Sequence, residues 1–165
     1  MRRSSILTQR NPRGQWSRRA FTLVEVIITM LVIGILAAAA APRCVNSLAQ
    51  RKAYAAAQRI AADLELARRT ARMASASRAV SFVFGDETYA VEGIQDLDRA
   101  ANGYTVSLKD APYGVDLVSA DFEGSPQVVF NGYGVPGASG TAVVASGNFT
   151  NTVRVDKTTG KVTIE

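Results

Sequence analysis

Hydrophobic and polar positions follow three successive patterns along the chain. Residues 26–42 carry no charge, and the apolar stretch counted from Ala20 is about as long as the roughly 20 residues that a bilayer-spanning helix needs. Between Pro42 and Arg78, small and apolar residues recur every three or four positions, and after Arg78 apolar and polar residues alternate. We therefore expect a membrane-spanning segment, then an amphipathic helix, then a β-rich region.

The amphipathic segment places one continuous stripe of small and apolar residues on a helix: Ala53, Ala57, Ile60, Leu64, Ala67, Ala71 and Ala74. Together with the apolar segment it predicts more than 50 helical residues, about 80 Å at 1.5 Å per residue. Pro42 is expected to interrupt or kink this helix, because proline lacks the N–H that its turn needs. The stripe is expected to pack on the chain's own sheet.

The alternating region predicts short strands separated by Gly, Asp, Asn and Pro, with Thr158-Thr159-Gly160 as the last hairpin turn. The expected strands lie at 79–84, 88–92, 104–109, 115–119, 127–131, 141–145, 152–156 and 161–165. A head of this size needs the helix stripe to complete its core. The predicted fold class is α+β, a long N-terminal helix packed on an antiparallel β-sheet head. Its expected parts are a leader (1–20), a transmembrane helix (21–42), an amphipathic helix (43–78) and the head (79–165).

Charge is distributed unevenly along the chain. Residues 1–20 hold six arginines and no acid, so the formal net charge of +5 becomes −1 if they are removed. Arginines beside an apolar span favour a cytoplasmic N-terminus and an exported remainder. Residues 43–78 carry a net +6 and residues 79–165 a net −6. This separation of charge is explained by two solvated surfaces. It also suggests that the basic helix of one subunit contacts the acidic head of another subunit, or anionic lipid headgroups.

Glu25 is the one charged residue inside the apolar segment. A carboxylate in the hydrocarbon layer costs on the order of 2.5–3.5 kcal/mol on insertion scales, so such a residue indicates a function and a partner. The natural partner is an amine in the same membrane layer.

The stretch R-R-A-F-T-L-V-E-V-I-I-T-M-L-V-I-G-I-L-A-A-A-A-A-P, which starts at Arg18, resembles the leader and first helix of type IV pilins and type II secretion pseudopilins. The resemblance implies cleavage by a prepilin peptidase between Ala20 and Phe21, and N-methylation of Phe21. It also implies that Glu25 pairs with a neighbouring subunit's amine during assembly. Gly34 and Pro42 match positions where the family loosens its helix. Ala20 departs from the family, which usually has Gly before the cut.

A second string is similar to the C-terminal signature of the H-type (GspH and FimT-like) minor pseudopilins: V-V-F-N-G-Y-G-V-P-G from Val128, followed by V-R-V at Val153 and G-K-V at Gly160. The similarity implies a minor subunit of a type II secretion pseudopilus or a type IV pilus-like filament. Its implied partners are prepilin peptidase, other pseudopilins or minor pilins, an inner-membrane assembly platform and membrane lipid. The implied location is the inner membrane, single-pass, with the head periplasmic.

Two alternatives remain open. The basic start and Ala37–Ala41 also fit a conventional or twin-arginine signal peptide, which would release a soluble protein or exported enzyme beginning near Pro42. FimT-like relatives suggest a minor pilin that captures DNA for uptake, with Arg154, Lys157 and Lys161 on the phosphates. Nucleic acid is disfavoured as a partner, because acidic residues lie among these three basic residues.

Catalytic, metal and cofactor sites are not expected. The chain has no histidine, and its single cysteine, Cys44, is expected to be a small buried residue. Gly132-x-Gly134-x-x-Gly137 matches a dinucleotide pattern as a string, but a strand-like segment follows it, so we interpret it as a turn. Asp96-Leu97-Asp98 begins like a calcium loop but continues with Ala100. Asn148-Phe149-Thr150 is interpreted as a surface turn.

Overall fold

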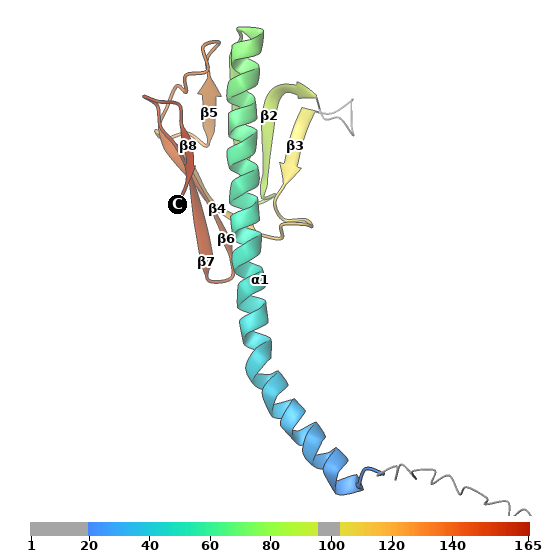
Figure 1. The fold of residues 1–165 in the computed structure, drawn as a ribbon. Helices are drawn as coiled ribbons and strands as arrows, with labels where there is room; N and C mark the ends of the chain where they lie inside the picture. The colour runs from blue at the N-terminus through green and yellow to red at the C-terminus, as the bar shows by residue number, and fades with distance from the viewer. Residues whose placement is uncertain (1–19, 96–102) are drawn as a thin grey trace, which may run out of the picture. The chain divides into compact units, whose positions relative to one another are not determined.

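The computed structural model describes residues 20–95 and 103–165, which form one long helix and eight strands (Figure 1). The elements are α1 (Leu23–Ala74), β1 (Arg78–Val83), β2 (Thr88–Gln95), β3 (Gly103–Ser107), β4 (Asp116–Phe122), β5 (Gln127–Phe130), β6 (Gly140–Ser146), β7 (Phe149–Val155) and β8 (Val162–Ile164). Every predicted strand is present, with ends displaced by at most three residues. The α+β prediction is confirmed.

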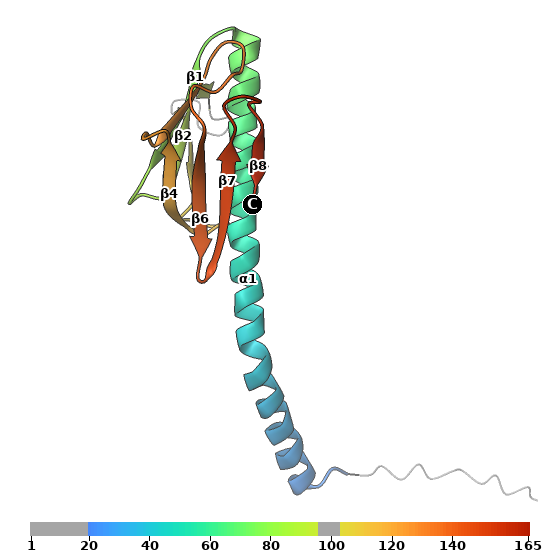
Figure 2. The same ribbon diagram turned by 90° about the vertical axis from the view of Figure 1, so that its left-hand side faces the viewer.

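The head contains two antiparallel sheets. The alternating pattern in the sequence predicted the strands but did not show which strands belong to which sheet. One sheet has the order β3-β2-β1-β5 and the other β4-β6-β7-β8. The register of β1 with β5 joins segments far apart in sequence, with Val80 opposite Val128. Figure 2 shows the second sheet lying along α1.

The core lies between the sheets and one face of α1. Helix residues on this face are fully buried: Ala53, Ala56, Ala57, Ile60, Leu64, Ala67 and Ala71. They belong to one cluster with strand residues that include Phe82, Tyr89, Phe122, Phe130 and Val153. Because most of the helix residues are alanines, the strands approach the helix closely, and the helix face completes a core that the small head needs.

α1 ends at Ala74, four residues before the predicted boundary. Ser75 adopts a left-handed conformation with φ 48°. The N–H of Ala76 donates to the Ala71 carbonyl at 3.1 Å, and the N–H of Ser75 to the Arg72 carbonyl at 3.3 Å. This pair of bonds is a Schellman motif, which satisfies the last carbonyls and stops the helix. Ala74, predicted to belong to the buried stripe, is therefore exposed.

The chain divides into two compact units, residues Met1–Ala40 and Ala41–Glu165. The second unit contains the whole core described above. α1 includes Pro42 without a break, so the predicted interruption is wrong, and a kink stays a prediction.

Candidate assembly surfaces

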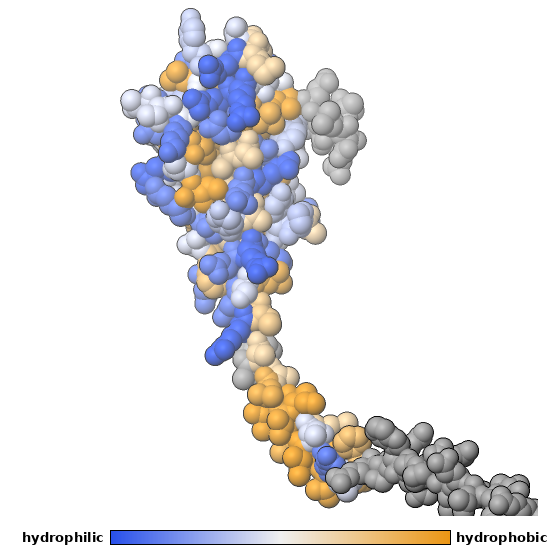
Figure 3. Space-filling view, viewed as in Figure 1, coloured by the Kyte–Doolittle hydropathy of each residue, from blue (hydrophilic) through white to orange (hydrophobic). Residues whose placement is uncertain are grey.

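The first unit has an uncovered apolar surface. Every residue from Ala20 to Ala38 is exposed, with Ile33 64% exposed and Leu36 64% exposed. Figure 3 shows this segment as largely hydrophobic. α1 is long and apolar enough near the N-terminus to cross a membrane. No described part of the chain buries these side chains, so a lipid or protein partner has to cover them.

The predicted processing residues lie at the start of this unit. Ala20 and Phe21 precede α1 in exposed, non-helical backbone. The hydroxyl of Thr22 accepts a hydrogen bond from the N–H of Glu25 at 3.2 Å, which makes Thr22 the N-cap of α1. Glu25 is itself exposed, and no base among the described residues forms an ion pair with its carboxylate.

Gly34 has no packing role within the described chain. A methyl group added to its Cα would find no heavy atom within 4 Å. Close intramolecular contact therefore does not explain this glycine. The assignment of Gly34 and Pro42 as helix-loosening residues stays a prediction.

Cys44 is exposed, so the prediction that it is buried is wrong. It lies on α1 ahead of the segment that the sheets cover, where the first fully buried helix residue is Ala53.

A buried carboxylate that the sequence analysis did not predict links α1 to the first sheet. Asp63 is 4% exposed and accepts hydrogen bonds from the hydroxyls of Tyr89, at 2.5 Å, and Tyr104, at 2.9 Å. The Arg59 guanidinium forms an ion pair with the same carboxylate at 3.0 Å and also contacts the Tyr104 hydroxyl. Burying a charge is costly unless it is paired and hydrogen-bonded, and here both conditions hold.

The same cluster alters the acidity of its tyrosines. Burial, followed by the nearby Asp63 charge, raises the pKa of Tyr89 well above its ordinary value. Burial and the hydrogen bond to Asp63 raise the pKa of Tyr104 in the same direction. Both hydroxyls therefore stay protonated and donate to Asp63, which fits a structural role in positioning the helix.

The part of the signature string that follows β5, from Asn131 to Gly137, forms a loop against the end of α1. The Asn131 side-chain oxygen accepts hydrogen bonds from the N–H groups of Tyr133 and Val135, each at 3.0 Å. The Arg68 guanidinium donates to the Gly134 carbonyl at 3.2 Å. β6 follows the loop, so the turn interpretation of the glycine pattern is confirmed.

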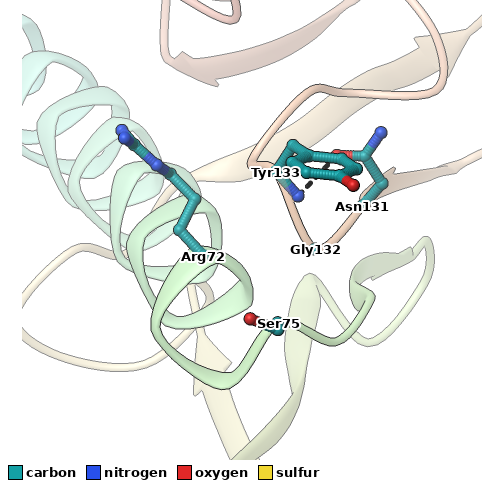
Figure 4. A pocket seen from close by; sticks show the side chains of 5 residues that line it. All are labelled: Arg72, Ser75, Asn131, Gly132 and Tyr133. Carbon is teal, nitrogen blue, oxygen red and sulfur yellow. Dashed lines mark hydrogen bonds between the residues drawn. The ribbon is translucent and has the colours of Figure 1, made fainter.

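Two glycines allow this loop to approach the helix. A methyl group on Gly132 would lie 2.8 Å from the Ser75 carbonyl carbon, and one on Gly134 would lie 2.6 Å from the Arg72 side chain. Gly134 also has φ 73°, which favours glycine. The loop and the helix end enclose a pocket of about 560 Å³ lined by Arg72, Ser75, Asn131, Gly132 and Tyr133 (Figure 4).

Comparison with protein families explains both signature regions. Residues 56–159 match the family model described as type II transport protein GspH, which covers more than half of the chain. The chain belongs to the GspH family. Residues 17–41 match the prokaryotic N-terminal methylation motif. Together the two matches identify a minor pseudopilin of type II secretion and imply processing by a prepilin peptidase. A comparison with curated protein sequences finds no significant match.

Solved structures share the fold of this GspH-family protein. The minor pseudopilin EpsH from the type 2 secretion system of Vibrio cholerae aligns with a TM-score of 0.54 at 16% identity, over 69% of this chain and 96% of that chain. A second EpsH structure gives 0.54 at 12% identity, over 70% and 97%. The type IV minor pilin FimU of Pseudomonas aeruginosa gives 0.52 at 13% identity, over 70% and 89%. At these identities the likeness concerns the fold.

Two of the three basic residues considered for DNA binding form ion pairs with acidic residues of the head. Arg154 forms an ion pair with Glu165 at 3.3 Å, and Lys157 with Glu123 at 3.1 Å. The described residues contain no group of three metal-ligating side chains. The Asp96-Leu97-Asp98 string lies outside the described residues. Asn148 lies in the turn before β7, but Phe149 and Thr150 begin that strand, so the surface-turn interpretation is correct only for Asn148.

Proposed function

We propose that this minor pseudopilin is cleaved between Ala20 and Phe21, methylated on Phe21 and incorporated through α1 into a pseudopilus. The observation that carries the proposal is the uncovered apolar surface of α1 with one carboxylate, Glu25, four residues after the new N-terminus. In a filament, the helices of neighbouring subunits cover this surface.

Glu25 has a specific role in this proposal. Cleavage creates a positively charged amine at Phe21, and both charges then lie in a layer of low dielectric constant. An unpaired charge is costly there, so the free energy of a subunit falls when its carboxylate forms an ion pair with a neighbour's amine. The pair therefore aligns each entering subunit in register with the previous one.

The location follows from the same segment. We place the leader arginines in the cytoplasm, the apolar first part of α1 across the inner membrane as a single span, and the head, with the second part of α1, in the periplasm. The proposed partners are prepilin peptidase, other pseudopilins and the inner-membrane assembly platform. The GspH family is a family of structural subunits, and we assign the chain no enzymatic activity.

Removing the charge at position 25 tests the assembly role. We expect Glu25→Ala and the isosteric Glu25→Gln to be expressed and processed but lost from sheared filament fractions, because both leave the neighbour's amine unpaired. The matched control is Thr29→Ala, which removes a polar group one turn further along α1 and should assemble normally. Normal incorporation of both Glu25 variants would refute the role.

The chain start tests the processing site and separates the alternatives. Intact mass and N-terminal sequencing of the protein from its own host's membranes should show a methylated chain beginning at Phe21. A chain beginning near Pro42 would instead identify a soluble exported protein, since residues 41–165 contain the whole described core. That result would also remove Glu25 from the functional protein.

A further inference from the structure

The stretch of α1 that directly follows the apolar segment carries only basic charges. Residues 26–62 contain no acid, and their charged residues are Arg43, Arg51, Lys52 and Arg59. Figure 3 shows hydrophilic side chains on α1 after the apolar segment. Arg43 lies one position after Pro42. In the proposed single span it is therefore the first charged side chain at the periplasmic end.

Arg43 and Arg51 share one face of the helix with Ser47. These three residues are spaced by four positions, so their side chains lie one above another. Together with Cys44 and Leu48 they line a pocket of about 350 Å³. Both arginines are exposed, and neither forms an ion pair with a described acid. The pocket therefore combines two guanidinium groups, a hydroxyl and an apolar side chain.

The head leaves this face of α1 open. A methyl group on Gly147, in the turn between β6 and β7, would lie 3.9 Å from the Ala49 Cβ. Ala49 and Arg51 are two positions apart and point to opposite sides of the helix, so the turn covers the other side. Lys52 is directed to the head, because a methyl group on Gly114 would lie 3.5 Å from its Nζ. Lys52 therefore does not belong to the pocket.

The length of this face suits the headgroup layer of a membrane. Arg43 and Arg51 are separated by about 12 Å along the helix axis at 1.5 Å per residue. The headgroup layer is about 5–7 Å thick on each side of the hydrocarbon. Helical side chains tilt towards the N-terminus, so the long side chain of Arg51 extends back towards that layer. Guanidinium groups bind phosphate oxygens with two parallel hydrogen bonds, and Leu48 offers an apolar contact to the glycerol part of a lipid.

We propose that Arg43 and Arg51 bind the phosphate of an anionic phospholipid in the periplasmic leaflet of the inner membrane, with Ser47 donating a further hydrogen bond. The inference rests on the proposed function, because it needs the apolar first part of α1 to span the membrane. Lipids whose headgroup carries an amine bind less well, since two guanidinium groups repel the amine's charge. The bound lipid fixes the depth and rotation of α1 before the subunit enters the filament.

An acidic surface of another protein is the second class of partner that two exposed arginines suggest. The observations favour lipid, because Arg43 adjoins the proposed span, where headgroups surround the helix at all times. Arg69 and Arg72, which are also exposed but lie near the far end of α1, have no such surroundings. They therefore supply a matched control.

Fluorescence quenching in bilayers measures the lipid preference at this site. The full chain carries Leu48→Trp as the reporter and Trp16→Phe, which removes the single native tryptophan. It is reconstituted in phosphatidylcholine bilayers that contain a small share of nitroxide-labelled phosphatidylglycerol or nitroxide-labelled phosphatidylcholine, with the label near the headgroup. Because the nitroxide quenches only at short range, lipids bound to the leader arginines on the other side of the membrane do not contribute.

We expect the labelled phosphatidylglycerol to be preferred about 25-fold, since each of two basic side chains at an anionic surface contributes about fivefold. Arg43→Gln combined with Arg51→Gln should abolish this preference. Arg69→Gln combined with Arg72→Gln changes the charge of the same helix equally and should leave the preference unaltered. All four arginines are exposed, so thermal unfolding should match that of the reporter chain in both variants.

Four results would overturn the proposal. The first is equal quenching by the two labelled lipids, and the second is a preference that survives loss of both Arg43 and Arg51. The third is a preference abolished by excess inorganic phosphate but not by chloride at equal ionic strength, which would identify a site for free anions. The fourth is a preference that disappears as the ratio of chain to lipid is raised, which would assign this face to the acidic head of another copy.

Failure of this inference is distinguishable from failure of the proposed function. Equal quenching by both lipids would place residue 48 at the membrane surface and leave the single span and the role of Glu25 standing. A reporter that neither lipid quenches would show that this part of α1 does not lie at the membrane. That result would overturn the lipid site and the proposed membrane placement together.

Discussion

The first and last parts of α1 belong to one helix but have opposite surroundings. Between Leu23 and Leu36 the large apolar side chains are all exposed, whereas from Ala53 to Ala71 one face is fully buried by the strands. The exposed part is rich in Ile, Leu and Val, and the buried face is mainly alanine. Burial within the chain therefore does not follow hydrophobicity, and the most apolar surface is the part that needs an external partner.

This contrast separates folding from assembly. The head has its own core, so its stability should depend on the buried face of α1 and not on the first unit. Assembly should depend on the first unit. The predictions that follow test this separation, beginning with the largest effect.

Substituting one isoleucine in each part of α1 compares the two directly. Ile60 is fully buried, so Ile60→Ala should lower the free energy of unfolding of the head by about 3 kcal/mol through lost burial and the cavity left behind. Ile33→Ala, the same change at a residue 64% exposed, should leave head stability unaltered. Chemical denaturation followed by near-ultraviolet circular dichroism measures both. Equal losses would show that the two parts of the helix do not fold independently.

Two strand glycines test how tightly the second sheet packs. A methyl group on Gly140 would clash with the Asp121 carbonyl oxygen and lie 2.5 Å from the Phe122 Cα, whereas one on Gly103 would meet no heavy atom of the described residues within 4 Å. Gly140→Ala should therefore cost about 2 kcal/mol, since overpacking forces the backbone to move. Gly103→Ala should be nearly neutral. A Gly140→Ala melting temperature equal to that of Gly103→Ala would contradict this packing.

The smallest expected effect is a pH dependence from the Asp63 cluster. Because burial and Asp63 raise the pKa of Tyr89, the folded chain holds this proton at pH values where the unfolded chain, with an ordinary pKa of about 10, releases it. The stabilisation is complete below about pH 10 and is lost as pH rises further towards the folded pKa, at up to about 1.4 kcal/mol per pH unit. The head should therefore weaken on titration above pH 10.

Tyr89→Phe removes the titrating hydroxyl and supplies the comparison. The variant should be less stable than the unaltered chain at pH 8, because Asp63 loses a donor, yet its stability should fall less steeply above pH 10. Free energies of unfolding at half-unit intervals from pH 8 to 11.5 measure both slopes. If the free energies of unfolding of the two chains fall in parallel with pH, the Tyr89 proton does not contribute to the pH dependence of stability.

The elements with a strong periodic pattern were predictable. The change from helical spacing to alternation after Arg78 indicated both the long helix and the positions of the strands. Within the predicted stripe, Ala74 was assigned to the wrong environment, because the helix is stopped by backbone hydrogen bonds of Ser75 and Ala76 that the side-chain pattern does not encode.

The Asp63 cluster was not predictable. Its hydroxyl donors, Tyr89 and Tyr104, lie 26 and 41 residues further along the chain. On the helix, Asp63 differs little from Glu65, which pairs with Arg68 near the surface. The distinction depends on which residues the strands bring to each side of α1. Cys44 was misassigned for a related reason, since helical spacing does not show where the sheets begin to cover the helix.

The sequence by itself determined the order of the parts, the type of each element and, through its two signature regions, the membership of the pseudopilin family. These are properties of local periodicity and of short motifs, which need no distant contact. Only the tertiary structure decided the division into two sheets, the burial of Asp63 and the pocket between Arg72 and Tyr133. Each of these depends on contacts between residues far apart in the chain, whose geometry is set when the strands pack on α1.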